Sequence, residues 1–569
     1  MSDTNYWKHV STGSVSRRQL IRGASLAGAG LAGAALIGCG DEKTETKPAA
    51  STPGGAAAAN APAGPQAKAG GRLVRAQEGD VPSFDQHGES TTLSNLPTSP
   101  GYNTIVKWAP DDVLEKPGGL KPSLASSWEI TPDGQTYTFK FVQNAKFHDG
   151  TPFTAADVKA SIERQISPPA GLTPPRQDQL RGAIKAMETP DNFTLKMTMN
   201  RPVSPLSMLP ILGQGWMVIY SKKDIDGKFD FKKQINGTGP YRDMQYARGN
   251  KVSWERNKDY FVKDRPYLDG LDIFIVPDAS TRNANLQSGQ LQAGAVAAKD
   301  WEVMKKALGD KVNYYQNPSL GFYTINFNTS KAPWKDARVR QAVNLALNKE
   351  DAMKVLVQGD ATIGGYLLPG GEWAIAAEDL RKVPGYGAQG ADSIAEAKKL
   401  MTAAGVADNL SVTLLTRNLQ SYQDMSLFVG DQLNKAFGWK GKSDIVETVI
   451  AYDRMTKRDF DLTPWVHGIS IDDPDAIWQE FYLDKSPRNY SELSTPAIKA
   501  AFDKQTVELD PTKRKALVQE LERLSLPELG KAMLFWSKSR YVASKTLQNW
   551  QPHVSTYNNM QYQDAWLNA

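Results

Sequence analysis

The sequence predicts an α/β fold, because stretches typical of strands alternate along it with stretches typical of helices. Residues 193–199, 251–254 and 271–276 are short runs rich in apolar and β-branched side chains, as strands are. Helical periodicity appears in longer stretches, at 279–288, 337–347, 394–404, 421–436 and 512–524. This interleaving argues against an all-α or an all-β fold.

The composition is that of a soluble globular protein. Hydrophobic residues make up 40% and charged residues 23% of the 569 residues. The formal net charge is +5, of which residues 1–38 contribute +3, so a net charge of +2 remains without them. A charge this small does not favour nucleic-acid binding, and we expect no nucleic-acid partner.

Residues 1–38 have the pattern of an export signal. A polar stretch ends in Arg17 and Arg18, and a run of Ala, Gly, Leu and Ile follows at 23–38. The paired arginines resemble the twin-arginine signal, whose machinery exports folded proteins. We therefore expect these residues to be removed and the protein to work outside the cytoplasm.

Cys39 follows this run and is the only cysteine in the chain. The small residue before it resembles a lipobox, in which the cysteine is acylated and becomes the first residue of the mature protein. A lone cysteine excludes disulfides and zinc–thiolate sites within the chain. Residues 39–69 are rich in Ala, Pro and Gly and predict a flexible tether. The expected location is the periplasmic side or the cell surface, anchored to the membrane by a lipid on Cys39.

Local signals place the first ordered elements. A short strand is expected at 71–76. Residues 127–130 and 137–141 flank a Pro-Asp-Gly turn and predict a β-hairpin. Thr154 predicts the N-cap of a helix that runs to about Arg164.

Four blocks of sequence carry a family resemblance. They lie at 122–158, which holds the hairpin and the capped helix, at 237–241, which reads Gly-Thr-Gly-Pro-Tyr, and at 256–270 and 327–343. In this order they resemble the family 5 extracellular solute-binding proteins, the receptors of dipeptide, oligopeptide and nickel ABC importers. Most of these residues are also typical of turns and helix caps. The blocks therefore identify the family, but they do not identify the residues of the pocket.

The resemblance implies a two-lobed periplasmic-binding-protein fold of type II, with an extra subdomain in the first lobe and the ligand cleft between the lobes. The implied boundaries are lobe I at 70–325 with its subdomain at about 112–236, lobe II at 326–533, and a return segment of lobe I at 534–569. Two crossings of the chain would form a hinge on which the lobes close around a ligand.

The function implied by the resemblance is capture of a peptide or similar small solute and its delivery to the permease of an ABC importer, by a monomer with no cofactor. Three alternatives remain open. The solute could be an oligosaccharide or another non-peptide, the same fold could serve a sensor, or the protein could be an exported lipid-anchored hydrolase with two catalytic carboxylates. The chain holds no GxSxG, Walker or HExxH motif, and its five histidines lack metal-ligand spacing, so we expect a binding protein with no metal and not an enzyme.

The candidate pocket is the segment around 465–475. By resemblance, Trp465, Val466, His467 and Gly468 belong to a cleft strand whose backbone pairs with an extended peptide. Aromatic stacking on a sugar is the alternative for Trp465, as for Trp373, Trp478 and Tyr482, although core packing is the expectation for each.

Ser470 stands where peptide-binding members of the family have an aspartate that pairs with the ligand's ammonium group. A hydroxyl cannot neutralise an ammonium group that is taken out of water. Asp472 or Asp473 could replace that carboxylate, but capping of the following helix is the favoured role for this acidic cluster. We therefore predict that dipeptides with a free amine bind weakly or not at all compared with neutral or blocked ligands, and calorimetric titration with matched free and N-acetylated dipeptides measures the difference.

Three further contacts are expected at strand ends, where clefts form in α/β sheets. Arg417 and Asn418 follow the predicted strand at 412–416, and Glu78 follows the first strand.

Overall fold

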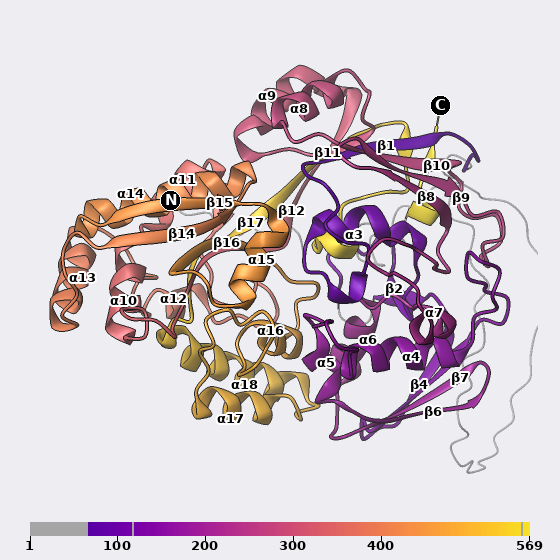
Figure 1. The fold of residues 1–569 in the computed structure, drawn as a ribbon, viewed down its shortest axis with the longest axis horizontal. Coiled ribbons are helices and arrows are strands. Elements are labelled where there is room, and N and C mark those ends of the chain that lie inside the picture. Colours follow the sequence, from indigo (N-terminus) through magenta and orange to yellow (C-terminus); the bar gives the residue numbers. More distant parts are fainter. Residues whose placement is uncertain (1–66, 117–118, 559–561, 569) are drawn as a thin grey trace, which may run out of the picture. The chain divides into compact units, whose positions relative to one another are not determined.

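A computed structural model describes residues 67–116, 119–558 and 562–568 of the chain. The predicted export signal, Cys39 and nearly all of the predicted tether lie outside the described residues. Residues 67–569 form one compact unit. Figure 1 shows the arrangement of its strands and helices.

The first sheet holds four strands in the order β1-β10-β9-β8. Their bounds are β1 Arg72–Gln77, β10 Gly270–Ile275, β9 Lys251–Arg256 and β8 Tyr241–Ala247. β1 runs parallel to β10, with Leu73 opposite Leu271, and the other pairs are antiparallel. Both leucines are buried in one core cluster with Trp254. The strands predicted at the start of the ordered chain and at 251–276 are therefore confirmed.

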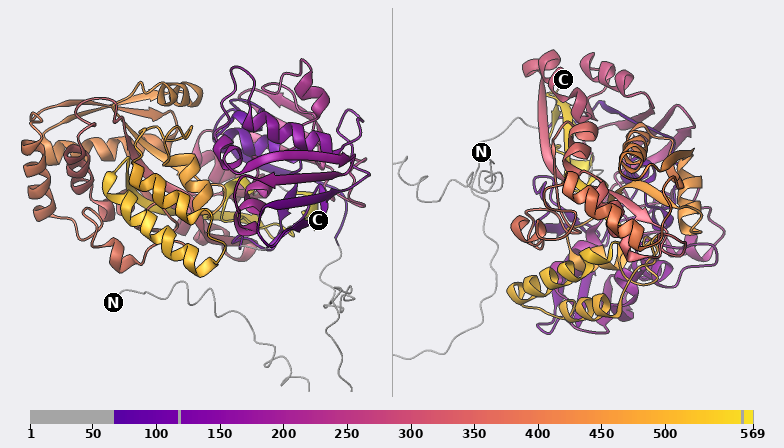
Figure 2. Two further views of the ribbon diagram at one scale, coloured as in Figure 1. Left: turned by 90° about the horizontal axis from the view of Figure 1, so that it is seen from below. Right: turned by 90° about the vertical axis from the view of Figure 1, so that its left-hand side faces the viewer.

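The second sheet has the order β4-β5-β7-β6 and is purple in the left-hand view of Figure 2. Its strands are β4 Ala125–Ile130, β5 Thr136–Phe141, β7 Thr194–Met199 and β6 Ile184–Asp191. β4 and β5 form the predicted hairpin. The predicted helix is α4 Ala155–Ile166, and the backbone N–H of Thr154 donates to the Asp157 carboxylate at 2.7 Å.

A seven-stranded sheet has the order β11-β17-β12-β16-β14-β15, and β13 pairs with β17. Its strands are β11 Ala293–Ala295, β17 Lys531–Ser544, β12 Val312–Phe327, β16 Leu462–Gly468, β14 Ser411–Arg417, β15 Lys440–Val446 and β13 Ala361–Thr362. β12 and β17 are long antiparallel partners. The C-terminal end of β17 pairs with β11, and the C-terminal half of β12 pairs with β16. The register between β12 and β17 shifts between Pro318 and Phe322.

The predicted helices all form, with ends displaced by at most a few residues. They are α8 Ala279–Gln287, α10 Ala337–Ala346, α13 Ala391–Ala403, α14 Gln420–Phe437 and α18 Pro511–Ser525. Further helices are α3 Thr92–Thr98, α5 Gln177–Arg181, α6 Pro205–Gly213, α7 Lys222–Asp226, α9 Ala298–Leu308, α11 Lys349–Val357, α12 Ala377–Leu380, α15 Thr448–Thr456, α16 Pro474–Phe481 and α17 Pro496–Gln505. Two small two-stranded sheets pair β2 Val106–Trp108 with β3 Leu120–Pro122, and β18 Leu547–Gln548 with β19 Trp566–Leu567.

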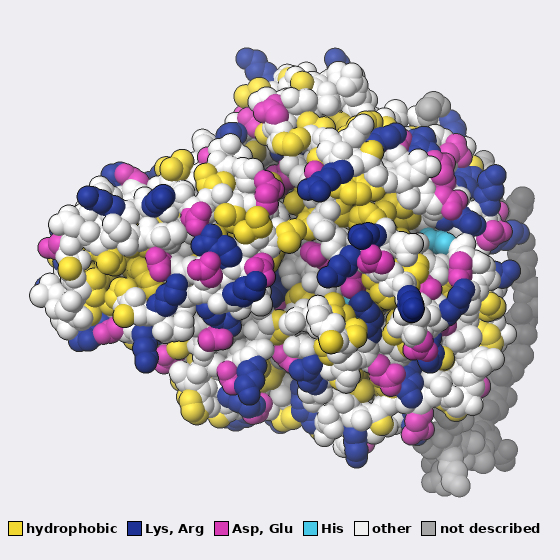
Figure 3. Space-filling view, viewed as in Figure 1, with side chains coloured by type: hydrophobic (Ala, Val, Ile, Leu, Met, Phe, Trp, Pro, Cys, Tyr) yellow, Lys and Arg dark blue, Asp and Glu magenta, His cyan; other side chains and the backbone are white. Residues whose placement is uncertain are grey.

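The face drawn in Figure 3 carries Lys and Arg side chains interspersed with Asp and Glu side chains. No large field of one sign is seen on this face, in keeping with the small net charge. Within the part of the chain that the structure describes, no helix combines the length and the apolar character that a membrane span requires.

Candidate functional site

A cleft of about 160 Å³ is lined by segments that lie far apart in the sequence. Residues before α3 and before α5 form one side, and residues of α15 and of the loop after α16 form the other. The lining residues are Pro82, Gly88, Glu89, Ser90, Thr173, Pro175, Thr448, Val449, Tyr452, Thr456, Pro487, Arg488 and Tyr490. Residues from the two halves of the chain thus meet around one small space.

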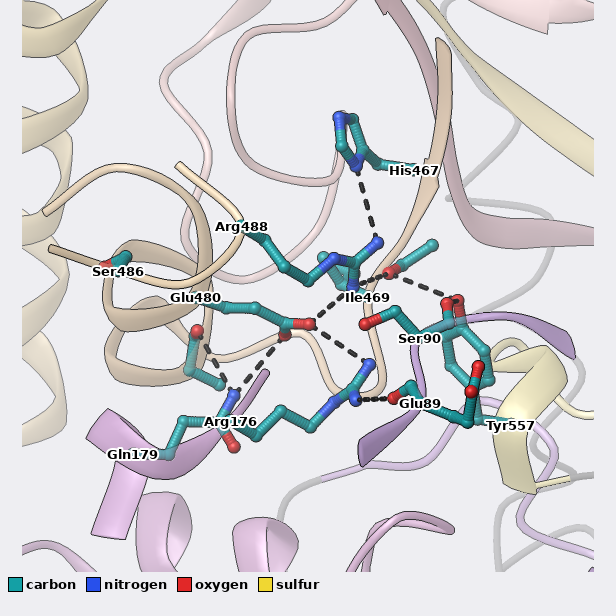
Figure 4. Close-up of polar contacts among 12 residues, drawn as sticks. Glu89, Ser90, Arg176, Gln179, His467, Ile469, Glu480, Ser486, Arg488 and Tyr557 are labelled. Carbon is teal, nitrogen blue, oxygen red and sulfur yellow. Dashed lines mark hydrogen bonds and ion pairs between the residues drawn. The ribbon is translucent and has the colours of Figure 1, made fainter. Parts of the chain in front are cut away.

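At this cleft, two arginines share one carboxylate (Figure 4). Arg176 lies 3.1 Å from an oxygen of Glu480, and Arg488 forms an ion pair with the same oxygen. All three side chains are 2% exposed. Because a buried charge is costly unless it is paired, this triad holds the loop before α5, α16 and the loop after α16 together.

Local structure and aromatic rings position the triad. Asp473 caps α16, since its carboxylate accepts from the backbone N–H of Asp475 at 2.9 Å, and Glu480 lies near the end of that helix. The expectation that the acidic cluster caps this helix is therefore confirmed for Asp473. The guanidinium group of Arg176 lies 4.4 Å from the ring centre of Trp216, a cation–π contact that offsets some of its lost hydration.

Burial lowers the pKa of Arg176. For Arg488 burial acts in the same direction, but the attraction of Glu480 and of nearby tyrosines together outweighs it and raises the pKa. Both guanidinium groups are therefore charged at neutral pH. Two positive charges against one negative charge leave the triad with a net charge of +1.

His467 fits this arrangement as a neutral ring. Burial and the nearby cations of Arg488 and Lys531 hold its pKa well below the usual value. Arg488 can only donate, so Nδ1 of His467 accepts from it at 3.4 Å. The proton then resides on Nε2, which lies 3.3 Å from the side-chain oxygen of Asn326.

Arg417 is a third buried arginine close to the place where the segments around this cleft meet, which we call the junction. It comes from the end of β14, as the sequence predicts, and its side chain donates to Thr91 at 3.3 Å and to Thr448 at 3.0 Å. Its guanidinium group lies 4.8 Å from the ring centre of Tyr422 and 5.7 Å from that of Trp465. Among the described residues no carboxylate forms an ion pair with Arg417, although the charge of Glu78 contributes to raising its pKa.

The outer edge of β16 is already occupied by side-chain donors. The carbonyl of Val466 accepts from the Tyr422 hydroxyl at 3.0 Å. The carbonyl of Gly468 accepts from Arg488 at 3.4 Å and from the Tyr557 hydroxyl at 3.5 Å. A side-chain carbon at Gly468 would lie 2.6 Å from that hydroxyl, so a larger residue here would force the Tyr557 side chain to move.

The other predicted contacts are dispersed. Ser470 is 2% exposed, its carbonyl accepts from Asn558 at 3.4 Å, and its hydroxyl has no partner among the described residues. Asp472 lines none of the described clefts, and burial raises the pKa of its carboxyl to about 7. Asn418 is exposed and donates to Glu447 at 3.3 Å.

Glu78 lines a second cleft, of about 230 Å³, with Arg75, Arg282 and Tyr541. Arg75 is buried there and lies over the ring of Trp550 at 5.2 Å.

The aromatic side chains that could stack on a sugar are core residues. Trp465 is fully buried, with Tyr422 and Tyr452 packed edge-on at 5.1 and 5.3 Å. Trp373, Trp478 and Tyr482 belong to another core cluster. The expectation that these rings pack in the core is therefore confirmed.

Glu89 faces the first cleft from the opposite side, and its backbone carbonyl accepts from Arg176 at 3.0 Å. Burial, with a smaller contribution from Asp85, raises the pKa of its carboxyl to about 8. At pH 7 this side chain is therefore mostly neutral. Among the described residues, no group of three or more His, Cys, Asp or Glu side chains is arranged to hold a metal ion.

Sequence reasoning missed Arg176, Glu480, Arg488 and Tyr557. Each lies in a segment with no recognisable motif, and Arg176 follows two prolines in a loop. Arg176 and Glu480 pair across about three hundred positions, and no local pattern reports such a contact.

Residues 119–489 match the bacterial extracellular solute-binding proteins, family 5 Middle. The chain belongs to this family. The predicted family is therefore confirmed, and members of family 5 bind solutes outside the cell.

Relatives in the family include heme-binding protein A of Haemophilus influenzae, 30% identical over 307 residues, which are 50% of this chain and 54% of that protein. Glutathione-binding protein GsiB of Pectobacterium atrosepticum is 30% identical over 358 residues, 62% of this chain and 65% of that protein. The chain thus spans between half and two thirds of the length of these relatives.

Among solved structures, AgaA of A. tumefaciens R10 in complex with agropinic acid is 25% identical, with a TM-score of 0.78 over 88% of this chain and 99% of that chain. The two-lobed α/β fold predicted from the sequence is therefore confirmed.

Proposed function

We propose that the protein is the substrate-binding component of an ABC importer, which captures a peptide or similar small solute outside the cytoplasm and delivers it to the permease. The observation that carries the proposal is the small cleft between the two halves of the chain, lined from both sides, in a member of a solute-binding family. The named relatives bind heme, glutathione and agropinic acid, so a compact solute other than a peptide fits the same proposal.

The mechanism rests on contacts that only a closed cleft can make. We propose the lobe boundaries given by the sequence, with lobe I at 70–325 and 534–569 and lobe II at 326–533, joined by β12 and β17. A solute that contacts both sides favours closure, and a shift from 1:99 to 99:1 in favour of the closed form needs about 5.5 kcal/mol of differential binding. The lipid on Cys39 would keep the protein near the permease and raise the frequency of their encounter.

The experiment is native mass spectrometry of the purified mature protein. We expect a 1:1 complex with a small solute that is released unchanged on denaturation, because a closed cleft retains what it binds and the mechanism breaks no bond. Prolonged incubation with the recovered solute provides the control. A hydrolysed product would instead favour the lipid-anchored hydrolase, and a protein that retains and rebinds no solute would contradict the proposal.

A further inference from the structure

Buried positive charge lies at the first cleft and next to it. Arg488 lines the cleft, Arg176 shares the Glu480 carboxylate with Arg488, and Arg417 donates to Thr448 of the cleft lining. Arg176, Arg417 and Arg488 are all at most 4% exposed, and among the described residues Glu480 is the one carboxylate that forms an ion pair with any of them. Glu89, the acidic residue in the cleft lining, is mostly neutral at pH 7. Buried charges in proteins are normally paired, and here the described side chains leave an excess of buried positive charge.

The cleft wall also holds an unused donor. Arg488 lines the cleft, and its Nε has no hydrogen-bond partner among the described residues. A guanidinium group presents its N–H donors in a planar fork that matches the two oxygens of an oxyanion.

An extended peptide does not find the backbone pairing that the sequence led us to expect. Strand addition needs free carbonyl groups along the receptor strand. At β16, the carbonyls of Val466 and Gly468 already accept from Tyr422, Arg488 and Tyr557. The triad and Tyr557 also fill the space next to Gly468. A solute in this cleft is therefore bound by side chains and not by the β16 backbone.

We infer that this cleft binds a compact solute of net negative charge, carried by a carboxylate or another oxyanion group, with Arg488 as its anchor, and that it does not bind an extended peptide through the β16 backbone. The inference rests on the proposed solute-binding function and names the class of solute. Arg488 is suited to the anchor because Glu480 holds it in place, because it lines the cleft, and because its Nε has no partner among the described residues.

The test uses small molecules from a bacterial extract. Ion exchange separates them into an anionic fraction, a fraction of neutral and zwitterionic molecules, and a cationic fraction. Because the cleft is small, gel filtration then divides each fraction at about 500 Da. The melting temperature of the mature protein is measured in each fraction. We expect the anionic fraction below that size to raise it by about 2 °C or more, because a ligand that binds only the folded state stabilises it. Phosphatase treatment of that fraction then separates phosphates, whose effect is lost, from carboxylates, whose effect remains.

Stabilisation by the cationic or neutral fraction alone, or by peptides above the size limit, would overturn the inference and leave the proposed function standing. No stabilisation by any fraction would overturn both. In the Arg488→Gln variant, where Glu480 keeps Arg176 as its partner, we expect the shift with the anionic fraction to disappear. Arg338, an exposed arginine of α10 that pairs with Asp336, gives the matched control, and Arg338→Gln should retain the full shift. If Arg488→Gln does not fold, the melting temperatures of the wild-type protein in the separated fractions still decide whether the solute is anionic.

Discussion

Replacement of Glu480 by glutamine is expected to lower the free energy of unfolding by about 3–5 kcal/mol. The two side chains have nearly the same shape, so packing is preserved and the charge alone is removed. Arg176 and Arg488, both 2% exposed, would then be buried next to each other without a carboxylate. Equilibrium unfolding in urea, followed by tryptophan fluorescence and by circular dichroism, measures the loss.

Glu492→Gln is the matched control, because Glu492 also pairs with an arginine, Arg458, but its side chain is 55% exposed. An exposed pair contributes about 0–1 kcal/mol, so this variant should unfold close to the wild type. Equal stabilities of the two variants would show that the triad does not hold the junction together.

Truncation of Trp465 to alanine is expected to cost about 3–5 kcal/mol of folding stability. The indole is fully buried, and its removal leaves a cavity between the rings of Tyr422 and Tyr452 and beneath the guanidinium group of Arg417. The same unfolding measurement applies.

Leu427→Ala provides the comparison, since Leu427 lies on α14 and is 66% exposed. Its loss should change stability by about 0.5 kcal/mol or less. A Trp465→Ala variant as stable as Leu427→Ala would mean that this ring is not part of the core and would return it to the role of a ligand contact.

The parts of the fold that were predicted correctly are those whose causes are local. The β4–β5 hairpin follows from two alternating runs around a Pro-Asp-Gly turn, and α4 follows from Thr154 and the carboxylate of Asp157 three residues later. The end of β14 likewise placed Arg417 at the junction. In each case the deciding residues lie within one turn or one strand.

The candidate site was predicted less completely because its contacts are not local. Glu480 pairs with Arg176 from the other half of the chain, and Tyr557 reaches Gly468 from near the C-terminus. Charge balance in a buried cluster depends on all of these partners at once. A sequence shows that arginines are present but not which of them share one carboxylate.

The position of β17 has a consequence for the timing of folding. This strand, Lys531–Ser544, lies between β11 and β12 inside the seven-stranded sheet, and Tyr557 of the candidate site follows it. Ribosomes add about 5–20 residues per second, and N-terminal segments fold first where they can. Here the sheet lacks an interior strand until residues 531–544 have been made. The sheet and the Tyr557 contact therefore form only after residues 531–557 have left the ribosome, and a chain cut before Lys531 would lack both.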